Sequence, residues 1–190
     1  MQHRKAGRKL GRNPKHQRAL LRNLASALIL TERDAEDYDT PEMAPKVRGR
    51  IVTTLIKAKE LRPFVERCVT LAVKAQKFIN AANDLNCKAA RGTDQWKEWR
   101  QGEGWKAWIK EAAPALACRR RAVQLLGSKE AVAILFDKIA PRYVGRPGGY
   151  TRILRLATPR LGDAGKRAII EFVGEETRAA KSAPIVPTVD

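Results

Sequence analysis

The residues of this sequence that could do chemistry are mainly cations, and many of them lie near the N-terminus. Residues 1–24 contain two histidines and no acidic side chain. Unneutralised positive charge with many hydrogen-bond donors suits the phosphates of nucleic acid, although a charge run that only keeps the protein soluble is the simpler alternative. The cations are Arg4, Lys5, Arg8, Lys9, Arg12, Lys15, Arg18 and Arg22.

A second group of cations surrounds the stretch RPGGYTRILRL, residues 146–156. Arg146-Pro147-Gly148-Gly149 predicts a type II turn, in which a glycine accepts positive φ. A phosphate could approach the glycine N–H groups while arginines fork around it; a plain hairpin turn is the alternative. Only Asp163 opposes the cations of this region, which are Arg142, Arg146, Arg152, Arg155, Arg160, Lys166 and Arg167.

Arg152 and Arg155 lie in an expected strand and are an odd number of residues apart. They therefore point to opposite faces of that strand, and both cannot face a core. The outward arginine contacts RNA beside Tyr150 or is simply exposed to solvent.

The sequence lacks the residue patterns of an enzyme. It has no paired carboxylates, no histidine with a partner and no Gly-rich nucleotide loop, since GRPGG does not end in Gly-Lys-Ser/Thr. Cys68, Cys87 and Cys118 are too widely spaced for a zinc site, and Cys68 is expected in the core. We expect no catalytic residue, no metal, no cofactor and no small-molecule substrate.

The four tryptophans lie close together in the sequence, in two pairs with i, i+3 spacing. Gly102 and Gly104 are expected to form a turn between the pairs, which are Trp96 and Trp99, and Trp105 and Trp108. The rings could stack on bases, but they more commonly form a small hydrophobic cluster or a protein contact.

The elements that must position these residues are helices with a few strands. Asn13-Pro14 predicts the start of a helix over about 14–30, and residues 51–54 a strand leading into a helix that kinks at Pro63. A further helix is expected from near Ala115 to Leu126, and Ser128 is expected to cap the helix that follows it. Two strands are expected over 150–156 and 168–173. This is an α+β fold: several helices packed on a small, mainly antiparallel sheet, with an extended basic N-terminal arm.

The overall charge indicates the class of partner. The chain has 190 residues, a net charge of +18 and a pI near 10.4, which favours binding to a polyanion. A generic nucleic-acid-binding or DNA-compacting protein would have the same charge, and an anionic membrane surface is a third alternative. No window approaches about 18 apolar residues, and no apolar segment follows the N-terminal charges, so we expect a cytosolic protein with no membrane partner.

Residues 34–45 have the opposite composition. Acidic side chains occur there without any base, and Pro41 and Pro45 break a helix. RNA would repel this loop, so we expect it to face solvent or the basic surface of a neighbouring protein.

Three blocks of the sequence resemble the bacterial ribosomal protein L17 family of the large subunit. They are HRKAGRKLGRNPKHQRALLRNLASALI, TTLIKAKELRPFVE, and RRRAVQLLGSKEAVAILFDKIAPRYVGRPGGYTRILRL with its continuation GDAGKRAIIEFV. The resemblance implies a structural protein of the large ribosomal subunit that binds rRNA near the rim where the nascent chain leaves. It also implies neighbouring ribosomal proteins as partners, for which residues 34–45 and Trp96–Trp108 are candidate surfaces.

The resemblance also carries the rRNA contacts onto particular residues. In the first block they are His3, Arg4, Lys5, Gly7, Arg8, Arg12, His16, Arg18 and Arg22. In the second they are Lys57, Lys59 and Arg62, and in the third Arg142, Arg146, Gly148, Gly149 and Arg152. Charge alone adds Lys9, Lys15, Arg155 and Arg160.

The chain departs from the family pattern in two segments. We therefore expect a basic RNA-binding arm over 1–13, a single α+β domain over 14–173 with insertions at about 34–50 and 76–115, and a disordered tail over 174–190.

Overall fold

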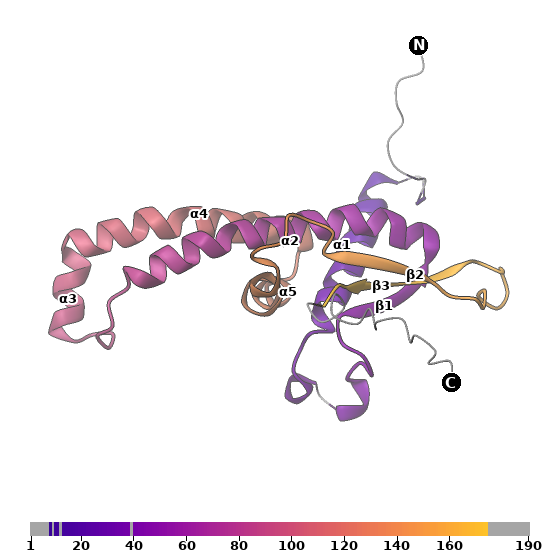
Figure 1. Cartoon of the computed structure of the whole chain (residues 1–190), viewed down its shortest axis with the longest axis horizontal. Helices are drawn as coiled ribbons and strands as arrows, with labels where there is room; N and C mark the ends of the chain where they lie inside the picture. Colours follow the sequence, from indigo (N-terminus) through magenta and orange to yellow (C-terminus); the bar gives the residue numbers. More distant parts are fainter. Residues whose placement is uncertain (1–7, 9, 12, 39, 175–190) are drawn as a thin grey trace, which may run out of the picture.

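The structure of the chain is a computed structural model that describes residues 8, 10–11, 13–38 and 40–174. It consists of a small sheet with helices packed on it, from which a long helical hairpin projects (Figure 1). Most of the expected arm over 1–13, and the expected tail over 174–190 apart from Gly174, lie outside the described residues.

Within the described residues, the sheet has three antiparallel strands in the order β1-β3-β2. They are β1 (Arg50–Thr54), β2 (Thr151–Arg155) and β3 (Arg167–Phe172), each within about one residue of the expected strand. Val52 and Leu154 both pair with Ile169 across the central strand. The α+β prediction is confirmed.

Helix α1 (Pro14–Leu30) has the predicted start. The Asn13 side chain accepts a hydrogen bond from the Lys15 N–H at 2.8 Å, and Pro14 occupies the first turn, where its missing N–H costs nothing. Its apolar face contributes Leu28 and Ile29 to the core.

Two long helices form the hairpin. Helix α2 (Leu55–Asp84) follows β1 directly and would be about 45 Å long at 1.5 Å per residue. The helix is continuous through Pro63, so the kink expected there does not end it. Proline has no N–H to bond the carbonyl one turn earlier, but Pro63 is on the exposed side of α2, where water can bond that carbonyl instead. Helix α4 (Glu103–Leu126) returns beside it and passes through Pro114. The expected start near Ala115 was therefore wrong.

Shorter elements complete the described chain. Helix α3 (Asp94–Gln101) joins the two long helices at the far end of the hairpin (Figure 1). Helix α5 (Lys129–Ile134) is capped by Ser128 as predicted, and continues as a π turn, η3 (Leu135–Ile139), and a 3-10 turn, η4 (Ala140–Tyr143). The acidic segment contains two more 3-10 turns, η1 (Ala35–Asp37) and η2 (Pro41–Met43).

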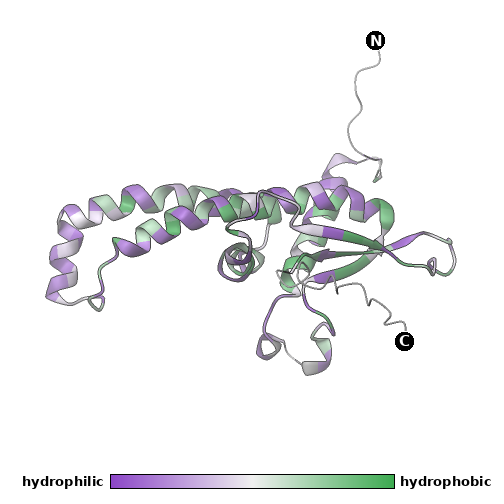
Figure 2. Cartoon of the chain, in the orientation of Figure 1, coloured by the Kyte–Doolittle hydropathy of each residue, from purple (hydrophilic) through white to green (hydrophobic). Residues whose placement is uncertain are grey.

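The core lies where α1, the first two thirds of α2, the end of α4, α5 and the sheet meet. Helix α2 supplies buried Leu61, Val65, Cys68 and Val69, which makes it the central element. Helix α3 has no buried residue and is coloured mainly hydrophilic, whereas the strands carry strongly hydrophobic segments (Figure 2). The hairpin therefore extends beyond the core.

Candidate nucleic-acid interface

The basic residues of the N-terminal block are only partly within the described chain. His3, Arg4, Lys5, Gly7, Lys9 and Arg12 lie outside it. Arg8 lies 3.3 Å from Glu60 of α2, measured from Nε to Oε1. Lys15, His16 and Arg18 are exposed on α1, and no acidic side chain of the described chain pairs with either cation. Lys15 and Arg18 are thus available to an external anion.

Arg22 has an internal role. Its Nε donates to the Leu125 carbonyl at 3.0 Å and its Nη2 to the Gln124 carbonyl at 2.8 Å. These carbonyls belong to the last turn of α4, where helical partners are missing and positive charge is favourable. Gly127 ends that helix with φ 73°, and a Cβ there would lie 2.8 Å from Arg22 Cδ. Arg22 therefore fastens α1 to the end of α4.

The cations at the start of α2 differ in their surroundings. Arg62 Nε lies 3.3 Å from Glu66 Oε1 one turn later. Lys59 is exposed and Lys57 is half-buried, and neither has an acidic partner among the described residues.

Glu66 holds the Pro-Gly-Gly turn against α2. Its carboxylate accepts the Gly149 N–H at 3.3 Å, the Thr151 N–H at 3.3 Å and the Thr151 hydroxyl at 2.9 Å. The Gly149 N–H, which we expected to approach a phosphate, is therefore bonded to a carboxylate of the chain itself. Binding by other atoms of the glycines stays a prediction.

The turn also differs from the expected type II geometry. Gly148 has φ 144° rather than about 80°, and Gly149 has φ 66°. Arg146 Nε donates to the Gly148 carbonyl at 3.1 Å, and the Tyr150 hydroxyl donates to the Arg146 carbonyl at 3.1 Å. These bonds fix the turn in one shape.

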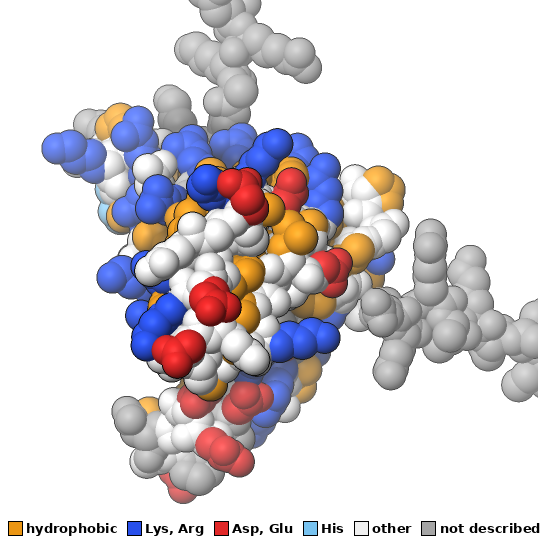
Figure 3. Space-filling view, turned by 90° about the vertical axis from the view of Figure 1, so that its left-hand side faces the viewer, with side chains coloured by type: hydrophobic (Ala, Val, Ile, Leu, Met, Phe, Trp, Pro, Cys, Tyr) orange, Lys and Arg blue, Asp and Glu red, His pale blue; other side chains and the backbone are white. Residues whose placement is uncertain are grey.

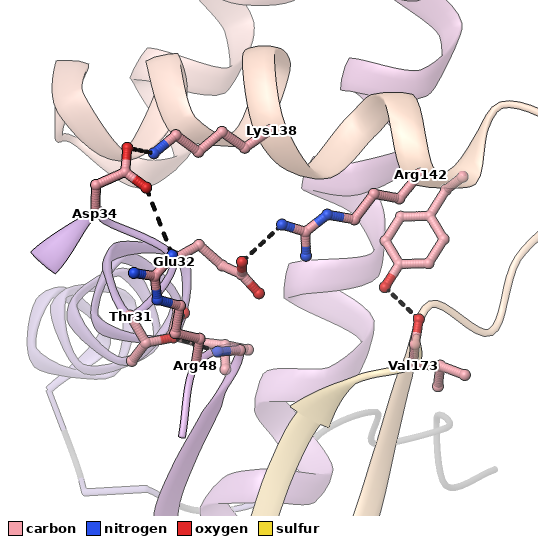
Figure 4. A network of polar contacts seen from close by, with 10 residues as sticks. Thr31, Glu32, Asp34, Arg48, Lys138, Arg142 and Val173 are labelled. Atoms are coloured by element: carbon pink, nitrogen blue, oxygen red, sulfur yellow. Dashed lines mark hydrogen bonds and ion pairs between the residues drawn. The ribbon is translucent and has the colours of Figure 1, made fainter. Parts of the chain in front are cut away.

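A cavity of about 420 Å³ lies beside this turn, and we call it the turn pocket. Arg142 on its wall reaches Glu32 at 2.8 Å, and Glu32 is only 6% exposed. The Tyr143 hydroxyl donates to the Val173 carbonyl at 2.7 Å, so η4 is fastened to the end of β3 (Figure 4). The turn pocket is lined by Arg142, Tyr143, Gly145, Arg146, Pro147, Gly148 and Val173.

The arginines of β2 and the following loop also have distinct partners. Arg152 pairs with Glu171, directly opposite on β3, whereas exposed Arg155 has no acidic partner among the described residues. Arg160 pairs with Asp163 through two nitrogens. The hydrogen bonds from Arg160, and then that from the Gly165 N–H, hold the pKa of the Asp163 carboxyl well below its usual range.

The acidic segment is partly tied to the body of the protein. Asp34 pairs with Lys138 and lies 3.5 Å from Arg48, and the hydrogen bond and charge of Lys138 lower the pKa of Asp34 (Figure 4). Asp34 is exposed, as expected for this segment, although its carboxylate pairs with cations of the chain itself. Within the described residues, Glu36, Asp37 and Glu42 are exposed and have no basic partner.

The tryptophans form a cluster at the end of the hairpin. Trp105 stacks on Trp108 with centroids 4.9 Å apart, and Trp99 meets both rings edge-on at 5.4 and 6.4 Å. The Arg100 guanidinium lies over Trp96 at 5.1 Å and over Trp105 at 4.7 Å. Gly102 separates α3 from α4 as expected, but Gly104 lies inside the first turn of α4. Viewed from this end, acidic and apolar side chains lie in front of a strongly basic margin (Figure 3).

Sequence reasoning identified the cations but missed the carboxylates that position them. Glu32, Glu66 and Glu171 accept bonds from the arginines or amides of the interface. Only Glu66 had a local signal, its i, i+4 spacing from Arg62. Glu32 and Glu171 meet arginines that are distant in sequence.

Two further observations concern the described residues alone. None of their helices has the length and apolar character required to cross a bilayer. No group of three or more potential metal-ligating side chains occurs among them.

The comparisons with known proteins agree with one another. The family described as Ribosomal protein L17 matches residues 20–173. The chain is 56% identical over 183 residues to the large ribosomal subunit protein bL17 of Rhodopirellula baltica, covering 96% of this chain and 86% of that protein. It is 38% identical to the bL17 of Nitratidesulfovibrio vulgaris, covering 98% and 97% of the two chains. It is also 40% identical to that of Thermomicrobium roseum, covering 91% and 99%.

Proposed function

The chain belongs to the ribosomal protein L17 family, and on that premise we propose that its basic surface binds and stabilises folded rRNA of the large ribosomal subunit. Members of the family are structural proteins of that subunit and not enzymes, so the chain is a structural component of the ribosome. The proposal concerns what its surface contacts there.

The observation that carries the proposal is the set of cations left without internal partners. The net charge of +18 is not confined to the N-terminal segment, because the folded part also presents unpaired cations. Neutralising RNA phosphates with such side chains releases counterions and supplies most of the affinity. Among the described residues, the cations of the candidate interface that no acidic side chain neutralises are Lys15, Arg18, Arg22, Lys57, Lys59, Arg146 and Arg155. Of these, Arg22 and Arg146 donate to backbone carbonyls.

A second set of cations gives this surface a fixed shape. Arg142 and Arg152 are each paired with a carboxylate that is less than a tenth exposed, namely Glu32 at 6% and Glu171 at 8%. Arg152 retains further N–H donors beside this pair, because a guanidinium carries five. A rigid arrangement of donors suits folded RNA, which proteins recognise largely by shape and by phosphate contacts. The arm residues His3, Arg4, Lys5, Gly7, Lys9 and Arg12 would extend the same surface.

The family resemblance further supports a place near the rim where the nascent chain leaves. Within that setting, we infer that the exposed acidic residues Glu36, Asp37 and Glu42 and the tryptophan cluster meet neighbouring ribosomal proteins. The acidic residues repel RNA, and three of the four indole rings already pack against one another instead of standing free to stack on bases.

The experiment compares binding of the full chain to folded large-subunit rRNA and to duplex DNA over a range of salt concentrations. We expect a strong preference for rRNA, with log K falling by about 0.7 to 0.9 per contacted phosphate for each unit of log salt. Equal affinity for both would contradict the proposal and indicate a generic nucleic-acid-binding protein.

A second measurement tests the setting in the cell. Ribosomes washed in high salt are analysed by mass spectrometry for copies of this chain per subunit. About one copy on the large subunit is expected for a stoichiometric component. Recovery of this chain from both subunits and from DNA would contradict the assignment to the large subunit.

A further inference from the structure

A small cavity lies at one end of the sheet, away from the turn pocket, and we call it the sheet-end pocket. Its volume is about 210 Å³, and it is formed by the end of β1, the start of α2, the β2–β3 loop and the start of β3. The β2–β3 loop projects beyond the start of α2 at the right of Figure 1. The sheet-end pocket is lined by Val52, Thr53, Thr54, Lys57, Arg160 and Arg167.

The polar character of this pocket is entirely cationic or neutral. Lys57, Arg160 and Arg167 bring three positive charges together, and none of the described residues on its wall is acidic. Like charges repel one another, and Asp163 neutralises Arg160 alone, so an anionic ligand would stabilise this arrangement.

Arg167 gives a separate indication that this pocket binds an anion. Its Nε is buried and has no hydrogen-bond partner among the described residues, and no acidic side chain pairs with its guanidinium. An unsatisfied buried donor costs about 1–3 kcal/mol, and more when it is charged. Arg167 is held beside the start of α2, because it pairs in register with Thr54 across the β1–β3 ladder.

Arg160 is fixed at the opposite wall by its own loop. Two of its nitrogens bind the Asp163 carboxylate, and the Arg160 N–H donates to the Gly165 carbonyl at 3.0 Å. The remaining guanidinium donors are free to bind a second anion. Asp163 therefore orients Arg160 without lining the pocket.

The start of α2 adds to the same field. The first turn of the helix contains no acidic residue, and the Thr54 side chain does not cap it. The Leu55 N–H donates to the Lys166 carbonyl at 2.9 Å, which ties the helix start to the entry of β3. Lys57 in this first turn thus stands near a helix end that already favours anions.

We propose that the sheet-end pocket binds a single phosphate of the rRNA backbone, held between Lys57, Arg160 and Arg167. This inference rests on the proposed function and deepens it, because it assigns one discrete phosphate to a site that includes Arg167. A phosphate diester supplies acceptor oxygens on several sides, which matches cations that converge from a helix, a loop and a strand.

The test uses the full chain and measures the salt dependence of its binding to folded large-subunit rRNA. The double variant Lys57→Gln/Arg167→Gln removes two charges but only one phosphate contact. We expect the slope of log K against log salt to fall in magnitude by about 0.7 to 0.9, the value of one phosphate. The variant Lys57→Gln/Arg167→Lys, which keeps a cation on β3, should recover part of that loss.

The matched control is Lys110→Gln, which removes one unpaired, exposed cation far along the hairpin and should leave the slope unchanged. Circular dichroism checks that each variant is folded. If the double variant does not fold, the single variant Lys57→Gln, at the protein surface, is used to repeat the test. A double-variant slope equal to that of the control would overturn the inference, and so would a loss of two phosphate equivalents. If the unaltered chain shows no preference for rRNA over DNA, the proposed function itself has failed.

Discussion

Glu66 is the acidic residue with most bonds to the candidate interface, and it binds the turn through backbone as well as side-chain donors. Its two oxygens hold Gly149 and Thr151 while Arg62 lies beside them. A carboxylate in this position neutralises part of the basic surface, and it also holds the turn against α2.

We expect Glu66→Ala to lower the free energy of unfolding by about 2 kcal/mol, because hydrogen bonds to a charged acceptor are lost and two amides lose their partner. Urea unfolding measures this loss, and hydrogen exchange at the Gly149 and Thr151 amides should accelerate at the same time.

Glu98→Ala is the control for this variant, since Glu98 is exposed on α3 and has no ion-pair partner among the described residues. If the two turn amides exchange at the same rate with and without the Glu66 carboxylate, the proposed fastening of the turn is wrong.

Cys68 gives a pH prediction. Burial raises the pKa of its thiol from about 9 to about 12, an effect that the charge of Arg67 partly offsets. Between these two values the unfolded chain releases the proton while the folded chain keeps it, so the folded state binds more protons and stability falls as pH rises. Below pH 9 both states are protonated and the group has no effect.

The measurement compares the unfolding free energies of the unaltered chain and Cys68→Ala at pH 8 and at pH 11. From pH 8 to pH 11, the unfolding free energy of the unaltered chain should fall by more than that of Cys68→Ala. The variant is less stable already at pH 8, because removing the thiol leaves a cavity. Parallel pH profiles would show that the thiol does not titrate across this range.

At the residue scale, the sequence was a good guide to charge and a poor guide to pairing. The positions of Arg142 and Arg152 were recognised, but Glu32 and Glu171 were not, because each partner comes from another element of the fold. Local spacing cannot show a bond between residues that are about 20 or 110 positions apart.

At the scale of the elements, capping signals were reliable and helix lengths were not. Asn13 and Ser128 cap the predicted helices with their side chains. The start of α4 was placed about twelve residues too late because Gly104 and Pro114 weaken the helical pattern. Packing of α4 against α2, and of Gly104 against Trp99 of α3, compensates for these residues. Neither contact is visible in the sequence of α4 alone.

Gly104 illustrates how such packing replaces propensity. A Cβ at this position would lie 2.6 Å from Cδ1 and Nε1 of the Trp99 ring. Gly104→Ala gains up to about 1 kcal/mol of helix propensity, but displacing the ring from its neighbours costs about 1–3 kcal/mol. We expect the tryptophan emission spectrum to shift and the end of the hairpin to melt earlier than the core.

Gly145→Ala serves as the control, because nothing lies within 4 Å of a Cβ at that position. An emission spectrum that Gly104→Ala leaves unchanged would mean that Trp99 does not pack as described.

At the scale of the whole molecule, the hairpin extends away from the core that the sheet and the other helices share. No residue between 86 and 112 belongs to that core. Replacing these residues with a short Gly-Ser linker should therefore change the melting temperature of the remainder only slightly and leave rRNA affinity within about threefold, since a change of 0.65 kcal/mol or less corresponds to that factor.

Equilibrium binding to rRNA and differential scanning calorimetry measure the two quantities. A fall in rRNA affinity of more than about tenfold would show that the tryptophan end of the hairpin contacts RNA, contrary to the assignment of this end to a protein neighbour.

The position of β3 in the sheet has a consequence for the order of synthesis. β1 ends at Thr54, but its neighbour in the sheet within the described residues, β3, starts at Arg167, so more than half of the chain is made between the two partners. The contacts within the α2–α4 hairpin span a shorter stretch of chain and can form earlier, because loop closure is easier for nearer segments. Pulse-labelled hydrogen exchange during refolding should show amide protection in α2 and α4 before β1. Until Phe172 has left the ribosome that makes it, β1 has an unpaired edge, and a newly made copy is most prone to aggregation during that interval.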